Sequence, residues 1–110
     1  MAAGSDLRVV LADDHNLIRS GLRTMLEAQD GIRVIGEAAD SAAAAKLTAD
    51  RRPDVLVLDL NMPGADPRSD IAALREAVPG TAIVVLTMQN DPRAARDLLR
   101  AGAAGYVLKQ

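Results

Sequence analysis

Five polar residues stand at or just after apolar runs in this 110-residue sequence. Asp13 and Asp14 follow "LRVVLA", Asp59 follows "VLVL", Thr87 ends "AIVVLT", and Lys109 follows "GYVL". A carboxylate beside a divalent cation can attack phosphorus and form an acyl phosphate. A hydroxyl and an ammonium group can then balance the charge on the phosphoryl oxygens. These residue types are therefore the ones that phosphoryl transfer to an aspartate requires.

The three acids predict a metal site if the fold brings them together. Two unit charges about 4 Å apart repel by roughly 4 kcal/mol at an effective dielectric near 20, so a cation must help to hold such a cluster. The sequence has no cysteine, and oxygen ligands select a hard ion, which favours Mg²⁺. We leave out the neighbouring His15, because Mg²⁺ prefers oxygen and a histidine at a helix start is more often structural.

The apolar runs predict the strands of a parallel sheet. Continuous runs of this length, bounded by Pro and Gly, are typical of strands that are buried on both faces. Five such segments are found, at residues 7–12, 32–36, 55–58, 82–87 and 105–108.

Helices are predicted between the strands. Apolar residues recur at helical spacing from Leu17 to Glu27, with Met25 among them, and Gly31 stands where a left-handed helix terminator is expected. Ser41 is the predicted N-cap of a second helix that ends before Pro53. Two further helices begin at Asp66-Pro67 and Asp91-Pro92 and end near Pro79-Gly80 and Gly102.

Strands and helices that alternate in this order predict a doubly wound α/β fold with right-handed crossovers. Ligands of such sheets bind beyond the carboxyl ends of the strands. All five polar residues are expected at that edge, and this joint placement favours a site over the alternative of a solvated loop with an unrelated Asp. Tyr106, the sole residue among Phe, Trp and Tyr, has two open interpretations, a functional side chain or a space filler.

Composition narrows the class of protein. The formal net charge of −2 argues against a basic nucleic-acid-binding face on this segment. The sequence shows no signal-peptide pattern and no apolar run near the roughly 20 residues that span a bilayer. We expect one soluble domain without a membrane partner, and the lack of cysteine is compatible with the cytoplasm.

Four stretches, "VLADDH", "LDLNMPG", "VLT" and "GAAGYVLK", are similar to those of response-regulator receiver domains of two-component systems, in the NarL/LuxR-type transcriptional branch. The resemblance covers essentially the whole chain, residues 1–110. It implies a flavodoxin-like, five-stranded parallel sheet in the order 2-1-3-4-5. It also implies a signalling module rather than an enzyme, limited to self-phosphorylation and self-dephosphorylation.

The resemblance also implies a role for each matching residue. Asp59 resembles the phospho-acceptor, Asp14 the direct carboxylate ligand of Mg²⁺, and Asp13 its usually water-mediated neighbour. The backbone carbonyl of Asn61 resembles the third protein ligand. The other three matches are Thr87 as the hydroxyl that follows the phosphoryl group, Tyr106 as the switch aromatic, and Lys109 as the phosphate-pairing cation.

Partners are implied by the family as well. The phosphoryl donor would be a sensor histidine kinase, and the output would be a C-terminal helix-turn-helix DNA-binding domain that lies outside this chain. Relatives continue into a fifth helix, whereas this chain ends at Gln110. We expect the uncovered apolar surface to make residues 1–110 associate as a homodimer or a domain-swapped oligomer.

Two other functions use similar residues. A phosphohydrolase of the haloacid-dehalogenase type also has an Asp nucleophile after a buried strand, but it needs a second carboxylate two residues later, where this chain has Asn61. A receiver-like module that is never phosphorylated is disfavoured by the intact set of acids, Thr87 and Lys109.

Overall fold

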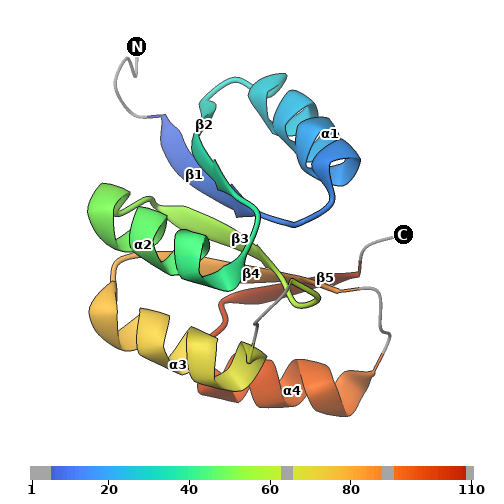
Figure 1. The fold of residues 1–110 in the computed structure, drawn as a ribbon, viewed down its shortest axis with the longest axis vertical. Helices are drawn as coiled ribbons and strands as arrows, with labels where there is room; N and C mark the ends of the chain where they lie inside the picture. Colours follow the sequence, from blue (N-terminus) through green and yellow to red (C-terminus); the bar gives the residue numbers. More distant parts are fainter. Residues whose placement is uncertain (1–5, 63–65, 88–90, 109–110) are drawn as a thin grey trace.

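Five parallel strands and four helices alternate along the chain in the computed structural model, which describes residues 6–62, 66–87 and 91–108. The sheet order is β2-β1-β3-β4-β5, as expected for the predicted doubly wound fold (Figure 1). The strands are β1 (Leu7–Ala12), β2 (Ile32–Ala38), β3 (Val55–Asp59), β4 (Ala82–Thr87) and β5 (Gly105–Leu108). The helices are α1 (Asn16–Glu27), α2 (Ser41–Arg51), α3 (Pro67–Ala77) and α4 (Pro92–Ala101).

Strand pairing places the candidate residues at one edge. Ala12 at the end of β1 pairs with Leu58 of β3, so Asp13 and Asp59 follow adjacent positions of neighbouring strands. β3 is one residue longer than predicted, because Asp59 still pairs with Leu86 of β4. The central acid therefore belongs to the sheet itself and not to the loop after it.

The predicted N-cap of α2 is wrong by one residue, whereas the predicted end of α1 at Glu27 is confirmed. Asp40, not Ser41, is the N-cap of α2, and its carboxylate accepts a hydrogen bond from the Ala43 N–H at 2.8 Å. The Ser41 hydroxyl instead donates to Asp70 Oδ2 of α3 at 2.9 Å. Gly31 has the predicted left-handed φ, at 86°, but it directly precedes β2 and does not cap α1.

The predicted starts of α3 and α4 are confirmed. Asp66 and Asp91 are the N-caps, and a proline follows each of them in the first turn. The Asp91 carboxylate also accepts from the Arg93 N–H at 3.0 Å. Gly102 ends α4 with a φ of 125°, a left-handed value that favours glycine.

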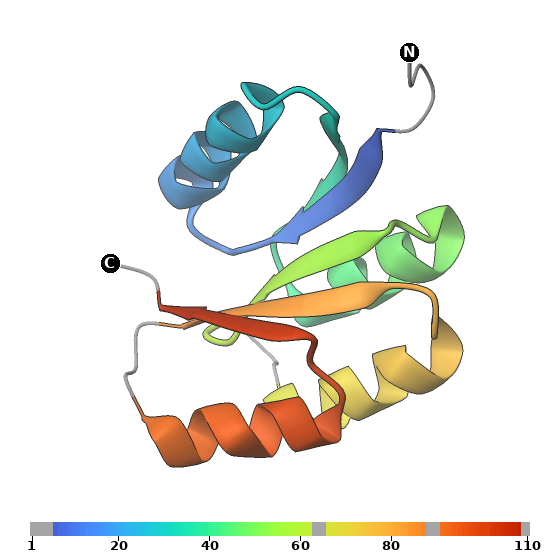
Figure 2. The same ribbon diagram turned by 180° about the vertical axis from the view of Figure 1, so that it is seen from behind.

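The two faces of the sheet are covered unequally. The helices α2, α3 and α4 lie on one side, and α1 lies on the other over β1 and β2 (Figures 1 and 2). Alternate residues on the three-helix side, such as Leu56, Ile83 and Val85, are fully buried in the main core. On the α1 side, Val57 and Val84 in the middle of the sheet are only partly buried.

Helix α1 contacts the sheet with only part of its apolar residues. Leu22 and Leu26 pack against the smaller core of Val9, Leu11 and Val34. Leu17 and Met25 share the helical spacing, yet their exposed fractions are 86% and 62%. These two residues therefore lie outside the contact with the sheet, because a helix packed on two strands covers only one stripe of its surface.

Candidate functional site

The acids of the first and third strand ends meet at one place. Single ligand atoms of Asp13, Asp14, His15 and Asp59 all lie within 4.8 Å of one another. The parallel pairing of β1 with β3 brings these side chains together at the carboxyl edge where the sequence analysis placed them. Four groups that could hold a cation are thus held by two neighbouring strands and the loop after β1.

Burial differs strongly among the three acids. The exposed fractions are 1% for Asp13 and 0% for Asp59, whereas 29% of the Asp14 side chain is exposed. A buried carboxylate needs hydrogen bonds or a counter-charge. Backbone N–H groups provide two of these bonds, from His15 to Asp13 Oδ1 at 2.8 Å and from Asn61 to Asp59 Oδ1 at 3.1 Å. The backbone thus fixes two carboxylates, while Asp14 is partly exposed with its Oδ1 atom beside His15.

His15 belongs to this cluster, although the sequence analysis left it out. Its Nδ1 atom lies 3.2 Å from Asp13 Oδ1, 3.2 Å from Asp14 Oδ1 and 4.0 Å from Asp59 Oδ2. The residue is the N-cap of α1, but its side chain makes no capping hydrogen bond. The position of His15 directly after Asp13 and Asp14 could have indicated that it belongs to the cluster. It was left out because Mg²⁺ prefers oxygen ligands.

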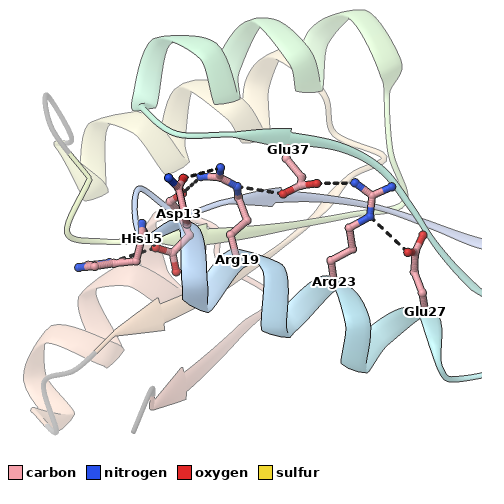
Figure 3. Close-up of polar contacts among 7 residues, drawn as sticks. Asp13, His15, Arg19, Arg23, Glu27 and Glu37 are labelled. Carbon is pink, nitrogen blue, oxygen red and sulfur yellow. Dashed lines mark hydrogen bonds and ion pairs between the residues drawn. The ribbon is translucent and has the colours of Figure 1, made fainter.

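A second polar group behind the acids was also missed. Arg19 on α1 donates to the backbone carbonyl of Asp13 and to Glu37 on β2, and Glu37 accepts a second hydrogen bond from Arg23 (Figure 3). Burial works to raise the pKa of Glu37, but the hydrogen bonds and positive charges of Arg23 and Arg19 hold it below its usual range. Glu37 therefore stays ionised between two guanidinium groups.

Thr87 and Tyr106 lie on the same face of neighbouring strands. Thr87 ends β4 with an exposed fraction of 2%, and it pairs with Leu108 of β5. Tyr106 pairs with Val85, two positions earlier, and packs half-buried against the main core. The packing satisfies the space-filling interpretation and leaves a switch role as a prediction. Lys109 lies outside the described residues.

A cavity of about 340 Å³ opens beside Thr87. Leu60 and Asn61 line it from the end of β3, and α3 and α4 supply further lining residues, including Leu98. It therefore extends from the end of β3 to the middle of α4 and leaves room for side chains there to move.

None of the helices in the described parts of the chain has the length and apolar composition that a membrane crossing requires.

The sequence of this chain is similar to those of known regulatory proteins. A family model described as the response regulator receiver domain matches residues 9–110. The transcriptional regulatory protein YhcZ of Bacillus subtilis is 39% identical over 103 residues, which cover 94% of this chain and 48% of that protein. This chain thus spans about half the length of the curated relatives that it matches.

Solved structures agree with the family model. The receiver domain of the response regulator NarL from Mycobacterium tuberculosis is 38% identical with a TM-score of 0.89, covering 94% of this chain and 84% of that one. A LuxR-family two-component response regulator from Aurantimonas is 35% identical with a TM-score of 0.90, covering 96% and 76%.

Proposed function

This chain belongs to the response-regulator receiver family, and from that premise we propose that it accepts a phosphoryl group on Asp59 from a sensor histidine kinase. One observation carries the proposal. The carboxylate of Asp59 is fully buried at the end of β3, and it lies with Asp13 and Asp14 in a cluster less than 5 Å across. Three acids in this position serve no evident purpose in packing, because like charges repel at such distances.

The cluster fits Mg²⁺. Ligands about 2.1 Å from an octahedral Mg²⁺ lie roughly 3 to 4.2 Å apart, so oxygens spread over at most 4.8 Å need only a small inward movement or a bridging water. Asp13, Asp14, Asp59 and the backbone carbonyl of Asn61 would hold the ion. When bound, Mg²⁺ supplies positive charge that neutralises the phosphoryl oxygens.

The transfer itself is a substitution at phosphorus. An Oδ atom of Asp59 attacks the phosphorus of the phosphohistidine, a P–O bond forms, and the P–N bond breaks with its electron pair left on the imidazole. Asp59 would attack as the carboxylate, the form that a bound Mg²⁺ would favour, so the step needs no general base. The Asn61 N–H, which donates to Asp59 Oδ1, holds the nucleophile in orientation.

We assign the switch to Thr87 and Tyr106, with Lys109 as the cation that pairs with the phosphoryl group. The new negative charge on Asp59 would draw the Thr87 hydroxyl toward it, and Tyr106 on the same face of β5 would turn inward. The shared face of Thr87 and Tyr106 and the cavity next to Thr87 support this assignment. The surface of α4 and β5 would then change between two states.

The output is proposed to be transcription. Relatives are named as transcriptional regulatory proteins, and this chain matches about half of their length. We propose that a separate C-terminal helix-turn-helix domain binds DNA and that the protein works in the cytoplasm. The net charge of −2 on this segment agrees with DNA contacts being made elsewhere.

Phosphoryl labelling tests the proposal. Incubation of the chain with acetyl phosphate and Mg²⁺ is expected to add one phosphoryl group per chain, detected by intact mass and removed by hydroxylamine, which cleaves acyl phosphates. Chelation of the metal should suppress the reaction. Release of many equivalents of phosphate from a phosphate ester would instead favour a haloacid-dehalogenase-type hydrolase, whose acid position is Asn61 here. No labelling at all would contradict the proposal.

We also propose that residues 1–110 on their own associate through the partly covered face of the sheet. Val57 and Val84 are partly exposed there, and Val107 on the same face of β5 is 48% exposed. V107K should shift the chain toward monomer in sedimentation velocity, because it puts a charge into the apolar contact. L99K on α4, where the side chain is 46% exposed, is the matched control and should leave association unchanged. A monomer at every wild-type concentration would refute the idea.

A further inference from the structure

We propose that Arg19 is a positioning residue for the metal-binding acids: it fixes the loop between β1 and α1 from behind, so that Asp13 and Asp14 are held ready for the cation. The inference rests on the proposed Mg²⁺ site. No feature of the sequence motifs assigns this role to Arg19.

The Arg19 side chain ties three elements together (Figure 3). Its terminal nitrogens donate to the backbone carbonyl of Asp13 at 2.5 Å and to Asn16 Oδ1 at 2.8 Å. Its Nε donates to Glu37 Oε1 on β2 at 2.9 Å. Only 17% of the Arg19 side chain is exposed, so these bonds are largely shielded from water.

The bond to the Asp13 carbonyl acts directly on the acid pair. The peptide unit between Asp13 and Asp14 is planar, so fixing its oxygen also fixes the direction in which the Asp14 Cα leaves the strand. The Asp13 N–H is already bonded to the Ala38 carbonyl of β2 at 3.0 Å. Arg19 thereby adds a second hydrogen bond to Asp13, at its carbonyl group, where the chain leaves β1 and enters the loop. Anchoring matters here because three like charges would otherwise push the loop outward.

The positive charge of Arg19, considered by itself, would weaken Mg²⁺ binding, whereas the proposed positioning role strengthens it. A guanidinium near the site repels a divalent cation, so simple removal of the charge should strengthen Mg²⁺ binding. Glu37 offsets this repulsion, because its carboxylate pairs with Arg19. Loss of a positioning bond should instead weaken binding, and loss of an outer-shell partner typically lowers metal affinity about 10- to 100-fold. The sign of the change therefore separates the two effects.

Arg23 offers a matched control on the same helix. It also donates to Glu37, and its other partner is Glu27 at 3.2 Å, one turn further along α1 and away from the acids. R23Q thus removes one arginine from the same glutamate without removing the bond to the Asp13 carbonyl. R19K keeps a positive charge but loses the planar fork that reaches three acceptors, and R19Q loses both.

The experiment is a Mg²⁺ titration of the full chain, followed by backbone amide chemical shifts, with thermal unfolding of each metal-free variant as the measure of folding. We expect a dissociation constant about tenfold higher for both R19K and R19Q, and within about twofold of wild type for R23Q. At saturating Mg²⁺, the rate of labelling by acetyl phosphate should return close to the wild-type value, which a general loss of fold would not allow.

The failures are distinguishable. If the wild-type chain does not bind Mg²⁺, the proposed function itself is contradicted. Wild-type binding with unchanged affinity in R19K and R19Q overturns the positioning role, and tighter binding by R19Q overturns it in favour of charge. If R23Q weakened Mg²⁺ binding as much as R19Q, the cause would be a general change in Glu37 and α1. This result would also contradict a specific role for Arg19.

Discussion

Replacement of Asp59 by asparagine is expected to abolish labelling of the chain by acetyl phosphate or by a phosphorylated kinase, while the fold stays intact. The amide lacks the anionic oxygen that attacks phosphorus, so no acyl phosphate can form. The substitution is nearly isosteric, and the asparagine Oδ1 can still accept from the Asn61 N–H. Removal of a fully buried negative charge beside two other acids should leave thermal stability equal or higher.

The matched control is D50N, which changes an exposed aspartate on α2 that pairs with Lys46. It should be labelled to the same stoichiometry and at the same rate as wild type. Both variants are to be compared by intact mass after equal exposure to phospho-donor and Mg²⁺, and by thermal unfolding. Stoichiometric, hydroxylamine-sensitive labelling of D59N would move the acceptor to another residue and would refute the assignment.

Most of the sheet could be predicted from the sequence because its signals are local. Each strand is a continuous apolar run, and Pro or Gly marks many of the boundaries between elements. The N-cap of α2 was missed because Asp40 and Ser41 are both good capping residues. A long-range contact decided between them, since the Ser41 hydroxyl bonds to Asp70 on α3.

In the candidate site too, features that depend on local sequence could be predicted, and those that depend on long-range contacts could not. That Asp13, Asp14 and Asp59 share one edge followed from the parallel strands, whose carboxyl ends lie on the same side of the sheet. That β1 and β3 are neighbours at this edge was implied by the family resemblance, and the strand pairing agrees with it. The place of Arg19 could not be predicted in this way, since it depends on Glu37, 18 residues away on β2. His15 was adjacent to the acids in sequence, but the direction of its ring depends on the path of the loop into α1.

Asp14 provides a prediction in which stability and metal affinity move in opposite directions. Without metal, D14N is expected to be more stable than wild type, because one of three clustered negative charges is gone. Asp14 is partly exposed, so screening reduces the gain to on the order of 1 kcal/mol. The asparagine Oδ1 can keep the contact with His15 Nδ1. The affinity for Mg²⁺ should fall by more than the roughly 10- to 100-fold that loss of an outer partner costs, because Asp14 is the proposed direct ligand.

Addition of Mg²⁺ should therefore invert the order of stability. At a concentration 100 times the wild-type dissociation constant, the ion stabilises wild type by about 2.7 kcal/mol. A variant that binds 100-fold more weakly gains only about 0.4 kcal/mol under the same conditions. Thermal or urea unfolding with and without Mg²⁺ measures both effects, with D50N as the control that should follow wild type. If Mg²⁺ stabilised D14N as much as wild type, Asp14 would not be a ligand, and the acid cluster would need another explanation.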